Sequence, residues 1–202
     1  MLSQIDKGTL QKKQIDTLSA KYFHVWQLEP IKKVNFVIDI LSFCVPALYF
    51  PIRYFAKGTR YQEVAEVSWE ILAAVLGALA LAKVIAKWQE KAEAHSRLRD
   101  ENMTMFTEAS KLLRDDNVSR ETVDQFLARC DKLEGEDRGL LGDPPKDRKQ
   151  AAYREAMKEV TPGSVNVVCP ICRASPYLFK KGSCDTCGNT PVDHAQKKVE
   201  NV

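Results

Sequence analysis

Two long apolar segments constrain the fold of this chain more than any other feature. Residues 34–55 contain only two charged side chains, Asp39 and Arg53, and residues 64–86 are apolar over most of their length. A helix that crosses a membrane needs about 20 mostly apolar residues, and both segments reach that length. Because the connector at residues 56–63 is short, the two helices would be antiparallel neighbours. The sequence therefore predicts a transmembrane helical hairpin, with two buried helices of a soluble bundle as the alternative.

Prolines and aromatic residues favour the membrane over the soluble bundle. Pro46 and Pro51 lie within the first segment, and membrane helices tolerate proline better than soluble ones do. Tryptophan and tyrosine are enriched at membrane interfaces, and aromatic side chains gather toward the rims of both segments. These rim residues are Trp26, Tyr49, Phe50, Tyr54, Phe55, Tyr61, Trp69 and Trp88.

The basic residues around the hairpin indicate its orientation, because cytoplasmic flanks carry an excess of lysine and arginine. More of them flank the outer ends of the two segments than flank the connector. We therefore expect a two-pass protein with both termini in the cytoplasm. The outer flanks carry Lys32, Lys33, Lys83, Lys87 and Lys91, and the connector side carries Arg53, Lys57 and Arg60.

Small residues recur at helical spacing along the second segment. Such residues let helix backbones approach closely in lipid, so they are candidates for helix packing and for a homo-oligomer. Carboxylates within a span are candidates for an ion path, and Asp39 and Glu70 are the two best placed. Glu63 and Glu66 are expected in water at the interface. The small-residue positions are Ala73, Ala74, Gly77, Ala78 and Ala82.

The flanking sequence is helical in pattern, so the predicted fold is mainly α. Four parts follow: an N-terminal cytosolic amphipathic helix in residues 1–33, the hairpin in 34–86, a cytosolic helical region in 87–160, and a C-terminal zinc ribbon with its tail in 161–202.

The cytosolic helical region divides further. The second span should continue without a break to Asp115, because this stretch lacks glycine and proline, and His95 within it is expected in solvent. A helix at residues 120–134 carries an apolar face that includes Cys130. Residues 135–145 are expected to form a loop.

The last helix is expected to start beside that loop and to end near Val160. Asp143 would be its N-cap, and Pro144 would occupy its first position.

Four of the six cysteines stand in two C-x-x-C pairs with eleven residues between them: Cys169, Cys172, Cys184 and Cys187. In a reducing compartment such a cluster indicates metal, and four thiolates suit tetrahedral Zn²⁺. Iron can also occupy four thiolates. Redox pairs are disfavoured, because no thioredoxin-like βαβ pattern surrounds either motif. With no open coordination position, the site is expected to be structural.

Local details of the ribbon also follow from its sequence. Gly188 follows the last cysteine, where a turn often needs positive φ. Lys181 and Gly182 could form the turn of a short hairpin between the two pairs. Tyr177 and Phe179 stand among basic residues and could contact nucleic acid, although packing on the ribbon itself is the simpler interpretation. His194 is expected in solvent rather than among the metal ligands.

Composition and motifs exclude several classes of function. The net charge of +3 does not by itself indicate a nucleic-acid-binding protein. The first 30 residues lack a continuous apolar region with a cleavage site, so no signal peptide is expected. With three scattered histidines, no phosphate-binding loop and no plausible catalytic triad, the chain is not expected to be an enzyme.

The arrangement of elements resembles the SLATT domain over about residues 10–160. The stretches that carry this resemblance are AKYFHVWQ before the first span, EKAEAHSRLRDENMTMFTEASKLLR after the second, and AAYREAMKEV at 151–160. The tail resembles a group of mobile-element proteins with the spacing C-x-x-C-x11-C-x-x-C, which the four cysteines match without deviation.

The SLATT resemblance implies a function as a membrane effector of bacterial conflict systems, including antiphage defence. Such proteins are thought to assemble and breach the inner membrane when a partner sensor of the same locus detects infection. The resemblance supplies no enzyme motif. A membrane-anchored adaptor, whose ribbon recruits a protein or nucleic acid, is the alternative from a different functional class.

Overall fold

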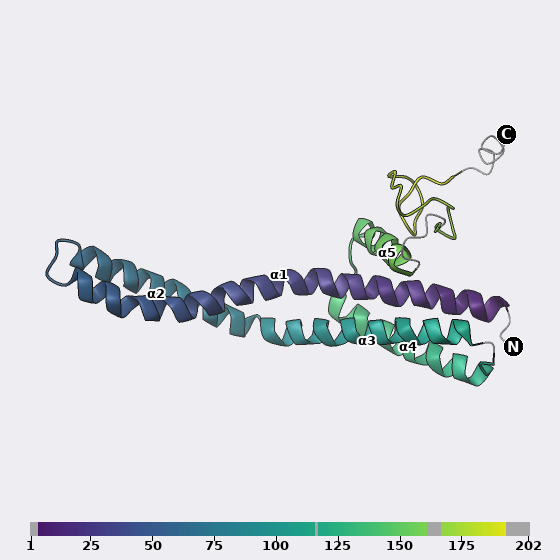
Figure 1. Ribbon diagram of the computed structural model, residues 1–202, viewed down its shortest axis with the longest axis horizontal. Coiled ribbons are helices and arrows are strands. Elements are labelled where there is room, and N and C mark those ends of the chain that lie inside the picture. Colours follow the sequence, from purple (N-terminus) through teal and green to yellow (C-terminus); the bar gives the residue numbers. More distant parts are fainter. Residues whose placement is uncertain (1–3, 116, 161–166, 193–202) are drawn as a thin grey trace. The chain divides into compact units, whose positions relative to one another are not determined.

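Five α-helices form the described part of the chain, and it contains no strand, so the fold is mainly α as predicted (Figure 1). The structure is a computed structural model that describes residues 4–115, 117–160 and 167–192. It divides into two compact units, one drawn from residues 1–25 and 96–202 and the other from 26–95. In chain order the helices are α1 (Gln4–Ala56), α2 (Gln62–Ile85), α3 (Trp88–Arg114), α4 (Arg120–Leu141) and α5 (Lys146–Val160).

The unit of residues 26–95 contains the helical hairpin, in which the second part of α1 packs against α2 (Figure 1). In α2 the less exposed side chains Trp69, Leu76 and Lys83 recur every seven residues, which is the spacing of two helices that wind around each other. The ring of Trp69 meets the edge of Tyr49 from α1, with centroids 5.6 Å apart. Seven-residue spacing therefore places one seam of α2 against α1.

The remaining surface of the hairpin is apolar and uncovered. In the most apolar window of each helix only 6% of the residues are buried, whereas a core helix of a soluble protein would be mostly buried. Phe43 and Phe50, for example, are 78% and 74% exposed. By length and composition α1 and α2 are both able to cross a membrane. This pattern disfavours the soluble bundle.

The other unit packs α3 and α4 against the first part of α1. Its core contains buried side chains from all three helices, with Leu10 and Phe126 fully buried. Cys130 belongs to this core, as predicted, and burial raises the pKa of its thiol to about 11. The thiol is therefore unreactive at neutral pH. The core cluster consists of Leu10, Ala109, Val118, Val123, Phe126 and Cys130.

A buried polar network crosses the same three helices. The Nε2 atom of His24 lies 2.8 Å from an oxygen of Asp137, and the amide of Asn102 donates to both oxygens of that carboxylate at 3.1 and 3.0 Å. All three residues are at least nine-tenths buried. Hydrogen bonds between buried polar groups offset the free-energy cost of removing those groups from water. These bonds form only in one alignment of the three helices, so the network specifies that alignment.

Helix bounds depart from the expectations at several places. α1 runs unbroken from Gln4 to Ala56 with three internal prolines, so no separate N-terminal helix ends at residue 33. The prediction of one continuous helix after the second span is wrong, because α2 ends at Ile85 and α3 begins at Trp88. Lys87 adopts a left-handed φ of 52° there. No glycine or proline signals this break.

Two further corrections concern the helical region. His95 is buried, not in solvent. The loop expected at 135–145 is helical as far as Leu141, because α4 continues through Gly135 and Gly139. The start of α4 follows local rules, since the Ser119 side chain accepts a hydrogen bond from the N–H of Thr122.

The last helix ends at Val160, as predicted, but it begins at Lys146. Asp143 is not its N-cap, because it lies three residues before the first helical residue, and its carboxylate pairs with the side chain of Lys149. Two prolines follow Asp143, and they lie before the helix instead of inside it.

Candidate metal centre

The two C-x-x-C motifs fold into turns with the same backbone pattern. In the first, the N–H of Cys169 donates to the carbonyl of Ala174, and the N–H of Arg173 donates back to the carbonyl of Cys169. In the second, Cys184 pairs in the same way with Asn189 and Gly188, and all four distances lie between 2.8 and 3.1 Å. The residue after each second cysteine is left-handed, at 61° for Arg173 and 71° for Gly188. The positive φ predicted for Gly188 is thus confirmed.

These two turns bring the four cysteines together. Each sulfur-bearing side chain is at least 95% buried, and the four sulfur atoms all lie within 4.8 Å of one another. Four thiolates around one Zn²⁺ at about 2.3 Å would lie about 3.8 Å apart. The sulfur atoms of Cys172 and Cys187 are 3.3 Å apart and no two of the four are more than 4.8 Å apart, so rearrangements of about 1 Å or less would complete the tetrahedron. The residues present fit a tetrathiolate metal site.

Backbone dipoles favour a thiolate at this centre. Burial acts to raise the pKa of the Cys184 thiol, but hydrogen bonds from the backbone N–H groups of Cys187 and Thr186 and from the Cys187 and Cys172 side chains together lower that pKa to about 7. Burial raises the pKa of the Cys172 and Cys187 thiols, so the thiolate is favoured at Cys184. Thiolate is the form that binds a metal ion. The second turn therefore stabilises the thiolate of Cys184, the first cysteine of that turn.

The hairpin turn expected at Lys181 and Gly182, between the two C-x-x-C pairs, is not formed. Lys181 is not in a turn but forms an isolated antiparallel bridge with Asn189, and the second cysteine turn lies between these two residues. Gly182 is required at this bridge, since a Cβ there would lie 2.3 Å from the Cα of Thr190. The chain between the pairs instead folds around Asn189. This buried side chain bonds the backbone of Ser175, Leu178, Lys180 and Thr190.

Helix α5 provides the platform on which the ribbon rests. The side chain of Gln150 donates to the carbonyl of Cys184 at 3.0 Å, and Arg154 donates to the carbonyl of Cys187. Met157, on the same helix, belongs to the buried cluster of the four cysteines. A zinc ion with four thiolates carries a net negative charge, so the Arg154 guanidinium lies where it would partly balance that charge.

The aromatic residues of the ribbon also contact α5. The Arg154 guanidinium stacks 3.8 Å from the ring centroid of Phe179, and the Tyr177 hydroxyl donates to the carbonyl of Lys158. These rings are partly engaged within the protein, which leaves less of their surface for nucleobases. Contact of these rings with nucleic acid stays a prediction.

The family comparison covers both the helices and the ribbon. Residues 7–190 match the family described as mobilome CxxCx(11)CxxC protein. The chain belongs to this family. The match begins in α1 and ends one residue after Asn189, so family membership rests on the helical part as well as on the four cysteines. No curated protein and no solved structure matches the chain.

Family membership and geometry agree on the metal centre. The CxxCx(11)CxxC family is described by the same spacing that the structure folds into one buried sulfur cluster. When bound, the ion would supply the cross-link that a small ribbon needs to fold. Cys169, Cys172, Cys184 and Cys187 would hold it, and His194 lies outside the described residues.

In the hairpin, the structure separates the small residues from the helix seam. Ala73, Ala74, Gly77, Ala78 and Ala82 are all exposed, and a Cβ added at Gly77 would meet nothing within 4 Å. They do not pack α2 against α1. Asp39 and Glu70 are not brought together either, because Asp39 pairs with Lys83, a partner that the sequence analysis did not assign.

A groove in the hairpin surrounds the other acidic position. Glu70 and Glu66 line a cavity of about 570 Å³ together with Arg53 of α1, near the connector. The Arg53 side chain donates to the Tyr49 hydroxyl at 2.9 Å. The groove is lined by Val45, Pro46, Tyr49, Phe50, Arg53, Glu66, Trp69, Glu70 and Ala73.

Proposed function

We propose that this protein is a membrane effector of a bacterial conflict system, which oligomerises and permeabilises the inner membrane when a partner sensor activates it. The observation that carries the proposal is the uncovered apolar surface of the hairpin, together with small residues that its own two helices leave unused. In lipid, such residues are free to pack against another copy of the chain. The resemblance of the helical part to SLATT proteins supports the same function.

The positions of the charged residues suggest how the hairpin would disturb a bilayer. In α2 the stretch between Glu70 and Lys83 is uncharged, and in α1 the stretch between Asp39 and Arg53 is uncharged. At 1.5 Å per residue each stretch spans about 20 Å, compared with about 30 Å of hydrocarbon in a bilayer. A hairpin of this kind either thins the bilayer or holds charged groups inside it. Both outcomes favour a leak once several copies assemble.

Membrane potential tests this proposal directly. The chain would be expressed from an inducible promoter in bacteria, alone and with its genomic neighbours under phage challenge, with a potential-sensitive dye as the readout. We expect depolarisation on activation. The Ala74→Leu variant should lose it, because the larger side chain would keep helices from packing closely at this position. Ala47→Leu is the matched control, because it adds the same atoms to an exposed alanine of α1.

Three outcomes would count against parts of this proposal. An intact potential, with the protein confirmed in the membrane and the system triggered, would contradict it. Equal depolarisation by wild type and by Ala74→Leu would contradict close packing through the small residues. Recovery of the chain in the soluble fraction without detergent would remove the membrane step altogether.

A membrane-anchored adaptor is the second candidate, and the exposed ribbon surface favours it. Ile171 and Leu178 are 70% and 75% exposed, and Lys180 and Lys181 beside them are exposed as well. Such a surface is suited to a protein partner. Under this function the ribbon binds its partner while ion gradients survive, and the Leu178→Ser variant loses the partner without changing metal content.

A further inference from the structure

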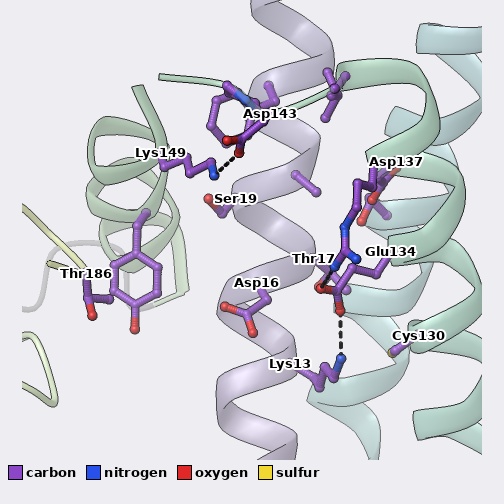
Figure 2. Close-up of a pocket in the computed structure, with 18 of the residues that line it drawn as sticks. Lys13, Asp16, Thr17, Ser19, Cys130, Glu134, Asp137, Asp143, Lys149 and Thr186 are labelled. Atoms are coloured by element: carbon purple, nitrogen blue, oxygen red, sulfur yellow. Dashed lines mark hydrogen bonds and ion pairs between the residues drawn. The ribbon is translucent and has the colours of Figure 1, made fainter. Parts of the chain in front are cut away.

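A pocket of about 640 Å³ opens beside the metal centre, between α1, α4, α5 and the second cysteine turn (Figure 2). Its size lies within the usual range of small-molecule sites. Helix α1 contributes the run from Lys13 to Phe23, and α4 contributes positions from Cys130 to Leu141. Tyr153 of α5 and Thr186 of the ribbon also line the pocket. None of these residues belongs to the four cysteines or to the hairpin.

Charge in the pocket is predominantly negative. Five carboxylates line it, Asp16, Glu134, Asp137, Asp143 and Asp185, against three basic side chains, Lys13, Arg138 and Lys149.

The three basic side chains already have partners. Lys13 pairs with Asp131 at 2.7 Å and with Glu134 at 3.1 Å, and Arg138 pairs with Glu134 at 3.3 Å. Lys149 pairs with Asp143, as Figure 2 shows. Each cation is therefore engaged by a protein carboxylate, so the pocket has little capacity for an anion.

Asp16 differs from the other carboxylates of the pocket. Within the part of the chain that the structure describes, it forms neither a hydrogen bond nor an ion pair, and its side chain lies on the pocket side of α1 (Figure 2). Burial raises the pKa of this carboxyl, although Lys12 and Lys13 oppose the rise. Asp16 is half-buried, and a carboxylate that is partly removed from water without a partner gains from a ligand that pairs with it.

Aromatic rings complete the site. Phe23 from α1 and Tyr153 from α5 both line the pocket, and aromatic faces attract cations and pack on short alkyl chains. A partnerless carboxylate, an excess of negative charge and two aromatic rings together select a positively charged organic molecule over an anion or a neutral one.

We propose that this pocket binds a small organic cation bearing an amine or a guanidinium group, with the Asp16 carboxylate as its counter-charge. The ammonium or guanidinium would donate to Asp16, and the carbon chain would lie against Tyr153 and Phe23. A bound ligand would touch α1, α4, α5 and the ribbon at once, so it would stabilise their arrangement. This site does not depend on the membrane function proposed above.

Calorimetric titration of the full chain, purified in mild detergent with zinc bound, tests the proposal. The probes are agmatine and spermidine, with adenosine monophosphate as an anionic control. We expect the two cations to bind. The Asp16→Asn variant should bind them with an affinity lower by a factor of about ten or more, because a charge-assisted hydrogen bond is lost. Asp124→Asn on the exposed face of α4 makes the same chemical change outside the pocket and should bind like wild type.

The opposite results are equally clear. Absence of binding at millimolar concentrations of both cations would overturn the proposal, as would equal affinity in wild type and Asp16→Asn. Preferential binding of adenosine monophosphate would overturn the charge argument. Circular dichroism of each variant shows whether it is folded, and Asp16→Asn should fold, since it removes a half-buried charge that has no partner. Thermal stabilisation by agmatine that is lost in Asp16→Asn and kept in Asp124→Asn provides a second readout.

Discussion

Lys83 of α2 donates a hydrogen bond to Asp39 of α1, with 2.7 Å between the lysine Nζ and a carboxylate oxygen. This ion pair joins the two helices of the hairpin at the end away from their connector. Each residue alone would be a costly charge near hydrocarbon, and together they satisfy each other. The predicted ion path through Asp39 stays a prediction, and in this structure its carboxylate is paired with Lys83.

Removing one member of this pair should be worse than removing both. We expect Lys83→Met to destabilise the hairpin by about 0.5–1 kcal/mol in detergent, because the Asp39 side chain is largely exposed and the pair is screened there. The double variant Asp39→Asn with Lys83→Met should recover most of that loss. Thermal unfolding followed by circular dichroism measures all three proteins. Equal stability of the single and double variants would show that the pair does not hold the helices in register.

The metal centre predicts one zinc ion per chain, bound by the four ribbon cysteines. Metal analysis of purified protein should find it, and Cys184→Ser should lose it. Cys130→Ser is the control, because Cys130 lies in the helical core away from the sulfur cluster, and it should keep the metal.

Metal removal by a chelator should also loosen α5. Gln150 and Arg154 bond the carbonyls of two ligand cysteines, so an unfolded ribbon deprives the helix of its contacts. Hydrogen exchange should be faster with the chelator than without it, both in α5 and in the ribbon. Faster exchange in the ribbon alone would mean that α5 is held by other contacts.

The two cysteine turns respond in opposite directions to substitutions at equivalent positions. Gly188→Ala places a side chain at a φ of 71°, where a Cβ would meet the Gln150 side chain at 2.5 Å, so we expect a loss of about 1–2 kcal/mol. Arg173→Gly relieves the same left-handed conformation and should raise stability by up to about 1 kcal/mol. Thermal unfolding of the zinc-bound protein measures both. A loss of similar size in both variants would indicate that Arg173 makes stabilising contacts that outweigh its backbone strain.

Asp16 predicts a pH-dependent change in stability. Burial raises the pKa of Asp16 in the folded protein above its ordinary value of 3.8, so the folded state binds the proton more tightly than the unfolded state does. The stability that this group contributes is therefore present below pH 3.8 and is lost as pH rises through the folded pKa. Asp16→Asn should be more stable than wild type at pH 7, and the difference should shrink in acid. The charged groups that face Asp16 are Lys12, Lys13 and Glu134, and the melting temperature of both proteins between pH 3 and pH 7 tests the trend.

The buried network predicts a larger effect. Asp137→Ala removes the acceptor of both His24 and Asn102 and leaves two buried polar side chains without it, so a loss of about 2–4 kcal/mol is expected. Asp124→Ala on the exposed face of the same helix should change stability by less than about 0.5 kcal/mol. Denaturant unfolding compares the two. Similar losses would point to helix propensity rather than to the network.

Local sequence rules accounted for the metal ligands and for the apolar helices. The spacing of the four cysteines is diagnostic because a C-x-x-C turn is short enough for two thiolates to face one ion, whatever surrounds it. The positive φ at Gly188 is likewise a property of the turn itself. The hairpin follows from two mostly apolar segments, residues 34–55 and 64–86, whose length and composition are those of helices able to cross a bilayer.

The errors of the sequence analysis have a common physical cause. Whether α2 continues into α3 depends on how each helix packs. No glycine or proline near Lys87 marks the interruption in the sequence. His95 stands in a charged stretch yet is buried, because burial depends on neighbours that are distant in sequence. Asp143 matched the sequence pattern of an N-cap, but α5 begins three residues later and the Asp143 carboxylate pairs with Lys149.

By itself, the sequence determined the composition of the metal site, the helical class of the fold and the apolar length of the hairpin, because each depends on residue type and short-range spacing. Only the tertiary structure decided which side chains meet. It paired Asp39 with Lys83, left the small residues of α2 exposed, placed the ribbon against Arg154, and left Asp16 facing a pocket without a partner. These relationships join residues far apart in the chain, so they arise from packing of the folded protein.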